Sequence, residues 1–267
     1  MESIKSTLTL IIFLFVTGIA FGQAKNKANT IVLVHGAWID ASAWYKVVPL
    51  LEAEGHEVIA VNLPGHGRDN TPYDKISLLS YVDVVKTAIG SKTNVTLVGH
   101  SLGGIIISQV AEEIPSQIKN LIYVAGFLPR NGESLHSLAS QDKDSHVGKF
   151  WHQDDAANHS PVLIKKEGLK EVFAEDAPKA DIDALIINNK ADALPPLGTP
   201  VKLTDENFGK KSKIYIYTIN DNAVTYTFQK QMTSATKVDK EYAIPTSHSP
   251  FLSKPKVLAS ILLEETQ

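Results

Sequence analysis

The stretch that decides the fold is residues 94–104, N-V-T-L-V-G-H-S-L-G-G. Residues 95–98 form a short apolar run that predicts a buried strand, and the small and aliphatic residues 104–111 predict a helix. Between them lies Gly99-His100-Ser101-Leu102-Gly103, a G-x-S-x-G pattern. A strand, a tight turn and a helix form the context of a nucleophile elbow, in which a strained turn exposes a serine hydroxyl. We therefore predict that Ser101 is a catalytic nucleophile.

Similar apolar runs recur along the chain and predict the fold class. Strands are predicted at residues 30–34, 57–63, 95–98, 120–125, 213–218 and 240–244. Helical patterns lie between most of them, and Asp40 or Ser42 is a candidate cap for the first helix. This alternation predicts an α/β protein with a mostly parallel, doubly wound sheet. Because the carboxyl ends of parallel strands share one edge, His35-Gly36, Gly65-His66-Gly67 and Ser101 should lie on the same edge.

The segment of about residues 130–212 has a different character. Its strand signals vanish, and polar helical stretches alternate with proline-rich loops such as residues 194–200. Since this insertion lies between two strands at the ligand edge, it should form a cap over the site. No linker divides the chain, so residues 23–267 are expected to form a single domain.

The N-terminal residues 1–22 predict a secretory signal peptide. Lys5 precedes an apolar run at residues 8–20, and Ala20-Phe21-Gly22 has the small-x-small form of a cleavage site. An uncleaved membrane anchor is the alternative, but the run is shorter than the span of about 20 residues that a bilayer requires. We therefore expect export to the periplasm or the outside, with no stable membrane association after cleavage.

Composition excludes several kinds of partner and cofactor. The net charge of −3 does not favour nucleic acid, and the absence of cysteine excludes disulfides and thiolate metal sites. The histidines of the expected cap, His146, His152 and His159, form no metal-binding motif. No nucleotide-binding glycine pattern is complete. We therefore predict no cofactor, no metal and no nucleic-acid partner.

A serine nucleophile requires a base, usually a histidine oriented by a carboxylate. In this architecture the chain order is serine, acid, histidine. His248 follows the last predicted strand, and Asp221 follows the strand before it, so both should reach the edge that carries Ser101. Asp192 and Asp205 are competing acids, but both lie in the expected cap.

Acyl transfer also requires backbone donors for an oxyanion. The Leu102 N–H, directly after the nucleophile, is one candidate. The second is the Ala37 N–H, in the loop after the first strand, where Gly36 allows the backbone to approach closely.

Four stretches together resemble a known family. They are Val32-Leu33-Val34-His35-Gly36-Ala37-Trp38, Gly99–Gly104, residues 203–208 (L-T-D-E-N-F) and Ser247-His248-Ser249-Pro250-Phe251. The combination resembles the α/β-hydrolase group that contains plant methylesterases, hydroxynitrile lyases and bacterial EstC-like esterases. The resemblance implies an α/β-hydrolase fold with a helical cap inserted after the sixth strand. It also implies a triad of Ser101, Asp221 and His248, with an oxyanion hole at Ala37 and Leu102.

Two departures from the family bear on the reaction. The hydroxynitrile lyases of this group carry threonine where Gly36 stands and lysine where Ser249 stands, and a cyanide leaving group requires that positive charge. We therefore expect a serine hydrolase that cleaves small carboxylic esters through an acyl-enzyme. Lyase or other cofactor-free chemistry at the same site, and a non-catalytic binder of small ligands, are the alternatives.

Overall fold

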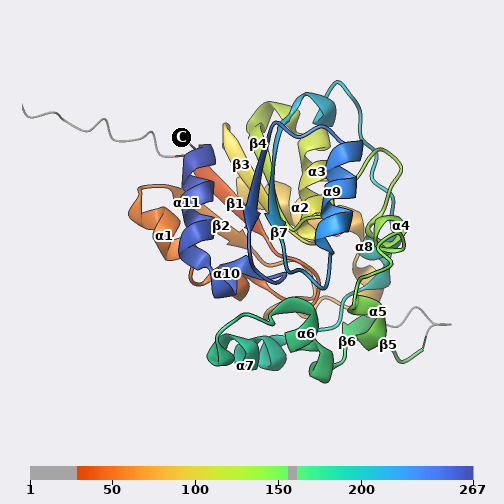
Figure 1. The fold of residues 1–267 in the computed structure, drawn as a ribbon. Coiled ribbons are helices and arrows are strands. Elements are labelled where there is room, and N and C mark those ends of the chain that lie inside the picture. The colour runs from red at the N-terminus through yellow and green to blue at the C-terminus, as the bar shows by residue number, and fades with distance from the viewer. Residues whose placement is uncertain (1–28, 156–160, 267) are drawn as a thin grey trace, which may run out of the picture.

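The computed structural model describes residues 29–155 and 161–266, and its centre is a sheet of six parallel strands (Figure 1). The strand order is β2-β1-β3-β4-β7-β8, and all five strand pairings are parallel. The predicted α/β class with a mostly parallel, doubly wound sheet is confirmed. The strands are β1 (Thr30–Val34), β2 (Glu57–Val61), β3 (Val95–His100), β4 (Ile118–Val124), β7 (Ser212–Thr218) and β8 (Lys240–Ile244).

The order in which successive strands are added to the sheet reverses between β1 and β3. From β1 it moves outward to β2, then returns to place β3 on the other side of β1, where Val34 pairs with Gly99. Every residue of β3 is buried, because helices cover both faces of a parallel sheet. Ligands of open α/β sheets bind in the crevice outside the carboxyl ends of strands at such a reversal. The elbow after β3 and the loop after β1 lie at this reversal.

The helices divide between the two faces of the sheet (Figure 1). Helices α1 (Val48–Ala53) and α11 (Pro255–Thr266) contact each other on one face, and α2 (Leu78–Ile89), α3 (Gly103–Glu113) and α9 (Tyr226–Ala235) cover the other. The first predicted helix is divided into η1 (Ala41–Trp44) and α1, and Asp40 caps η1 by accepting a hydrogen bond from Ser42 N. The short helices outside the cap are η2 (Tyr73–Lys75), η3 (Pro115–Gln117) and α10 (Pro250–Ser253).

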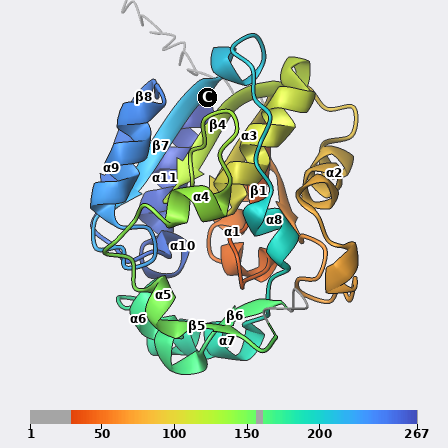
Figure 2. The same ribbon diagram turned by 90° about the vertical axis from the view of Figure 1, so that its right-hand side faces the viewer.

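Residues 130–211, called the cap below, connect β4 to β7. Many helices and strands of the cap lie together at one end of the molecule (Figure 2). The insertion follows β4, the fourth strand of the described chain, and not the sixth strand that the resemblance implied, because two of the six strands of the sheet, β7 and β8, come after the insertion. Two short antiparallel strands, which the sequence does not predict, pair within the cap. Its elements are α4 (Leu135–Ala139), α5 (Val147–Phe150), β5 (Trp151–Gln153), β6 (Val162–Ile164), η5 (Lys166–Gly168), α6 (Leu169–Phe173), α7 (Lys179–Asn188), α8 (Leu194–Gly198) and η6 (Phe208–Lys210).

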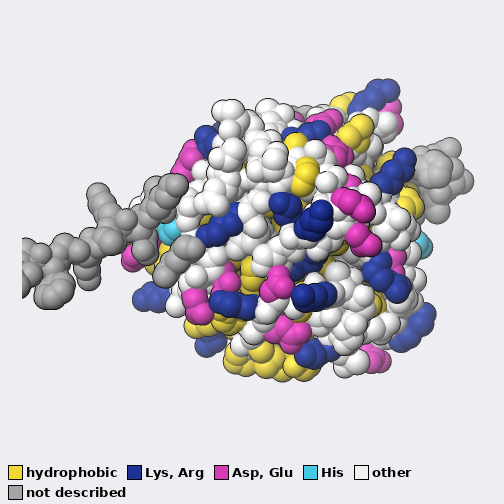
Figure 3. All heavy atoms as spheres, turned by 90° about the horizontal axis from the view of Figure 1, so that it is seen from above, with side chains coloured by type: hydrophobic (Ala, Val, Ile, Leu, Met, Phe, Trp, Pro, Cys, Tyr) yellow, Lys and Arg dark blue, Asp and Glu magenta, His cyan; other side chains and the backbone are white. Residues whose placement is uncertain are grey.

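The two ends of the described chain meet at the amino edge of the sheet. The Asn29 side chain, just before β1, donates a hydrogen bond to the Thr266 carbonyl, and Asn120 Nδ2 donates to the Glu265 carbonyl at 2.9 Å. Basic and acidic side chains are interspersed on the face away from α6 and α7 (Figure 3). Among the helices of residues 29–155 and 161–266, none is long and apolar enough to cross a membrane.

Candidate active site

Ser101 lies on a sharp turn between β3 and α3. Its φ of +52° falls in the left-handed region, which is costly for a residue with a Cβ and is typical of strained functional turns. The turn is held by the Ser101 carbonyl, which accepts hydrogen bonds of 3.0 Å from both Gly104 N and Phe127 N. A Cβ on Gly104 would lie 2.3 Å from the Phe127 carbonyl oxygen, so only glycine allows this close approach. The local structure is that of the predicted elbow.

The structure brings the predicted base and acid into direct contact. His248 follows β8, Asp221 follows β7, and 2.7 Å separates His248 Nδ1 from Asp221 Oδ2. Both residues are buried. A carboxylate can only accept a hydrogen bond, so Nδ1 carries the proton and Nε2 is left free to accept one.

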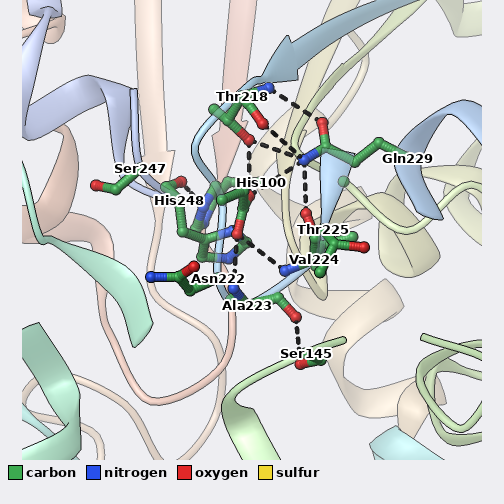
Figure 4. A network of polar contacts seen from close by, with 12 residues as sticks. His100, Ser145, Thr218, Asn222, Ala223, Val224, Thr225, Gln229, Ser247 and His248 are labelled. Atoms are coloured by element: carbon green, nitrogen blue, oxygen red, sulfur yellow. Dashed lines mark hydrogen bonds and ion pairs between the residues drawn. The ribbon is translucent and has the colours of Figure 1, made fainter. Parts of the chain in front are cut away.

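Four further donors fix the Asp221 carboxylate (Figure 4). Oδ1 accepts hydrogen bonds from the backbone N–H groups of Ala223 at 2.7 Å and Val224 at 2.9 Å. Oδ2 accepts from Thr218 Oγ1 at 2.7 Å and Gln229 Nε2 at 3.3 Å. A buried charge is tolerated when it is satisfied in this way, and each donor stabilises the ionised form.

Ser101 and His248 lie on adjoining segments, but among the described residues no hydrogen bond joins their side chains. The contact runs instead through His100, whose Nε2 lies 3.0 Å from the His248 carbonyl oxygen. The His100 and His248 rings are 4.5 Å apart between centroids. Burial, and then the nearby His248, lower the pKa of His100 well below its ordinary value. His100 is therefore neutral at pH 7, donates through Nε2, and packs against the proposed base.

The two predicted oxyanion donors both have free N–H groups. Within residues 29–155 and 161–266, neither the Ala37 N–H nor the Leu102 N–H donates a hydrogen bond. Both residues are buried, and the strands that precede them, β1 and β3, are neighbours in the sheet. A Cβ on Gly36 would lie 2.8 Å from both His100 Nδ1 and Ser101 Cβ, so the loop can approach the elbow only with glycine there.

Aromatic side chains cover the site from the cap. The Phe173 ring of α6 lies 5.7 Å from the His248 ring and 5.6 Å from the Trp38 ring. Trp151 of β5 packs edge-on against Trp38 at 6.3 Å. These rings make an apolar wall beside the proposed base.

The competing acids lie elsewhere. Asp205 is exposed in a loop whose neighbours Thr204 and Asn207 bind Glu112, at the end of α3 far from Ser101. Asp192 is fully buried, and its carboxylate contacts Trp38 and Tyr81 rather than His248.

The cap histidines pair with single carboxylates. His146 Nδ1 lies 2.8 Å from Glu171 Oε1, and His152 Nε2 lies 2.7 Å from Asp154 Oδ1. His159 lies outside the described residues. Among those that the structure describes, no group of three or more such side chains could hold a metal ion.

Several residues of the site were not predicted from the sequence. Thr218 and Gln229 support Asp221, His100 supports His248, and Phe173 covers it. Gln229 had one usable signal, because a glutamine between Phe228 and Met232 is unusual on the buried face of a helix. The others depend on tertiary contacts.

Known proteins share this fold over most of the chain. A family model described as an alpha/beta hydrolase family matches residues 31–261. Putative methylesterase 11, chloroplastic, from Arabidopsis thaliana is 33% identical over 251 residues, which cover 89% of this chain and 64% of that protein. The chain thus spans less than two thirds of that relative's length. Methylesterase 7 from the same plant is 31% identical, covering 90% of this chain and 97% of that one. A pyrethroid hydrolase from Sphingobium faniae JZ-2 superposes with a TM-score of 0.81 at 25% identity, covering 90% and 98%.

These comparisons contradict the predicted export to the periplasm or the outside. The Arabidopsis thaliana relatives putative methylesterases 11, 14 and 12 are named chloroplastic, which is not an exported location. The predicted signal peptide of residues 1–22 lies outside the described residues. An apolar run reports local hydrophobicity and does not by itself identify a compartment, which is why that prediction was wrong.

The elbow at the sheet reversal, the match of the family model over residues 31–261 and the full-length similarity to methylesterase 7 agree with one another. The chain belongs to the α/β-hydrolase superfamily and, within it, to the methylesterase group.

Proposed function

We propose that this protein is a serine esterase that hydrolyses small, largely apolar carboxylic esters through an acyl-enzyme. The observation that carries the proposal is the pairing of His248 with Asp221 at the sheet edge that also holds Ser101 and two unengaged N–H groups. The names of the relatives, methylesterases and a pyrethroid hydrolase, support ester cleavage as the reaction class.

In the first half of the reaction, Ser101 Oγ attacks the ester carbonyl carbon while His248 Nε2 takes the hydroxyl proton. The carbonyl oxygen becomes an oxyanion, which the Ala37 and Leu102 N–H groups bind. Asp221 accepts the Nδ1–H of His248 and stabilises the imidazolium that forms. The imidazolium then protonates the leaving alcohol, and an acyl-serine remains.

In the second half, water takes the place of the alcohol. His248 removes a proton from the water, which attacks the acyl carbon, and the same oxyanion donors are used again. Collapse of the intermediate returns the proton to Ser101 Oγ and releases the acid. The neutral state of His100 matters here, because a second imidazolium beside His248 would oppose the charge that each half-reaction creates.

The wall of Phe173, Trp38 and Trp151 supports an apolar group on the substrate side of His248. Methyl esters of apolar acids are therefore the first substrates to test, followed by esters with larger alcohol groups.

The test is a panel of p-nitrophenyl and methyl esters of graded size, measured beside Ser101→Ala. We expect turnover by the unaltered protein, and a loss of at least about 10³-fold in kcat in the variant. A fluorophosphonate should phosphonylate Ser101 Oγ with release of fluoride, so the protein should gain the mass of the reagent less that of HF and the variant should gain none. Turnover that survives the substitution would refute Ser101 as the nucleophile.

The alternative functions predict different results in the same experiments. Cleavage of a cyanohydrin without ester turnover would identify lyase chemistry, which Gly36 and Ser249 disfavour. Absence of fluorophosphonate labelling together with absence of turnover would identify a non-catalytic binder.

A further inference from the structure

Trp38, the residue after the proposed oxyanion donor Ala37, is held entirely by the cap. Its backbone N–H donates to Asp192 Oδ2 at 2.6 Å, and its indole Nε1 donates to the Val162 carbonyl at 3.0 Å. Its own carbonyl accepts from Lys190 N at 3.2 Å. Every polar group of Trp38 therefore bonds to a residue more than 120 positions away in the sequence.

Trp38 also has a backbone conformation that its own side chain does not favour. Its φ is +64°, in the left-handed region that is unfavourable for a residue with a Cβ. Such a conformation persists only where the surroundings impose it. The hydrogen bonds from the cap are the interactions that impose it.

Asp192 is the charged member of this contact and is fully buried. Its backbone exchanges two hydrogen bonds with Val162, of 2.7 and 2.8 Å, so the carboxylate sits at a fixed point of the cap. Oδ1 accepts from Tyr81 Oη at 3.2 Å and lies 3.3 Å from His66 Nε2. A buried carboxylate is expensive unless it is paired in this way.

His66 is a titratable group beside Asp192. His66 Nδ1 lies 3.1 Å from the Pro64 carbonyl, which can only accept, so Nδ1 carries a proton. Burial is the largest single influence and lowers the pKa of His66, but the Asp192 carboxylate and the Pro64 carbonyl together raise it by more, so the net shift is upward. The contact of His66 Nε2 with Asp192 Oδ1 thus joins the loop after β2 to the cap, and the other carboxylate oxygen accepts from the Trp38 N–H.

From these contacts we infer that Asp192 is a positioning residue, which holds the oxyanion loop, residues 36–38, in its active geometry from the cap. The inference rests on the proposed function, since it concerns the donor that the Ala37 N–H supplies. Fixing the peptide between Ala37 and Trp38 restricts rotation at Ala37, whose N–H must point at the developing oxyanion. Displacing a catalytic group by about 1 Å can cost on the order of 10²-fold in rate.

The test compares Asp192→Ala with Asp192→Asn. Alanine leaves Trp38 N–H without an acceptor. Asparagine keeps one oxygen for that N–H, and its amide can donate to Tyr81 Oη or to a neutral His66 Nε2. We expect Asp192→Ala to lower kcat by about 10- to 100-fold with KM within about threefold, since removing a whole oxyanion donor costs about 10²–10³-fold. The kcat of Asp192→Asn should be at least about tenfold higher than that of Asp192→Ala.

Two further variants complete the set. Asp183→Ala removes an exposed carboxylate of α7 that pairs with Lys179, and it should leave both constants unchanged. Asp192→Glu keeps the buried charge and displaces the carboxylate by one methylene, so it should lower kcat selectively even if the alanine variant fails to fold. A rise in KM with kcat unchanged, or an asparagine variant as slow as alanine, would overturn the inference.

A second measurement does not depend on ester cleavage. Amide hydrogen exchange of Trp38 should be at least about tenfold faster in Asp192→Ala than in Asp183→Ala, because the donor loses its buried acceptor. Exchange at an unchanged rate would refute the role of Asp192. If the unaltered protein cleaves no ester of the panel, the proposed function fails, while the exchange result still decides whether Asp192 holds the loop.

Discussion

Replacing Asp221 by asparagine should disable the base without disturbing the fold, for a reason that follows from its hydrogen bonds. Oδ1 accepts from two backbone N–H groups, which cannot reverse their polarity. The amide group of asparagine must therefore occupy the Oδ2 position, where the Thr218 hydroxyl can rotate and accept. Gln229 Nε2 loses its 3.3 Å contact with Oδ2 but keeps its hydrogen bond of 2.6 Å to the Val224 carbonyl. His248 Nδ1 then faces a donor. It can only respond by losing its proton, which moves to Nε2.

The expected loss is set by this change of tautomer. A histidine with the proton on Nε2 points a donor at Ser101 and cannot remove the hydroxyl proton. Loss of the correct tautomer in a serine hydrolase costs about 10⁴-fold in kcat. That factor corresponds to about 5 kcal/mol of transition-state stabilisation, at 1.36 kcal/mol for each factor of ten. KM should change little, since Asp221 is buried beneath His248 and contacts no open space.

The assay is kcat for p-nitrophenyl acetate at pH 7.5, with Ser101→Ala as the background. Asp205→Asn is the matched control, because it makes the same change at an exposed carboxylate that the sequence also offered as the acid. It should keep full activity, and thermal unfolding should show that Asp221→Asn remains folded. A loss smaller than about tenfold in Asp221→Asn, or a large loss in the control, would refute the assignment of Asp221.

Two further predictions concern stability. Burial first, and then the electrostatic effect of His66, lower the pKa of His35 to about 4. Between pH 6.5 and 4, His35 is therefore protonated in the unfolded chain but still neutral in the folded protein. The free energy of unfolding should therefore fall with decreasing pH across that window, by up to about 3 kcal/mol near pH 4. When this free energy is measured by urea unfolding at several pH values, it should depend less steeply on pH in His35→Gln than in the unaltered protein. Equal dependence on pH in the two proteins would contradict the prediction. Gly104→Ala should destabilise by about 2–3 kcal/mol because the new Cβ meets the Phe127 carbonyl, whereas Gly148→Ala, in a helix with no atom within 4 Å, should be neutral or up to about 1 kcal/mol stabilising. Equal melting temperatures for the two glycine variants would exclude the clash.

The central sheet was predictable because its information is local. A parallel strand buried on both faces is a continuous apolar run, as in residues 95–98, and the glycines beside Ser101 mark the turn that follows. The placement of Asp221 and His248 follows from strand ends that share one edge. Their mutual contact at 2.7 Å is consistent with that expectation.

The cap was less predictable for the opposite reason. Strands β5 and β6 have three residues each, too few for a period to be recognised, and each is stabilised by the other. The sequence marked Asp192 only as a candidate acid. Its partners Trp38 and Tyr81 are 154 and 111 positions away, so its part in holding the oxyanion loop depends on contacts that no local pattern encodes.

The meeting of residues 29 and 266 at the amino edge of the sheet has a practical consequence. Ser101 and the cap lie at the carboxyl edge, so residues 29 and 266 lie on the side of the fold opposite the catalytic entrance. A carrier protein or a solid support attached directly beside residue 29 or residue 266 would therefore leave the entrance uncovered. The same proximity makes residues 29–266 suitable for circular permutation, with a short peptide joining residue 266 to residue 29 and new termini in an exposed loop.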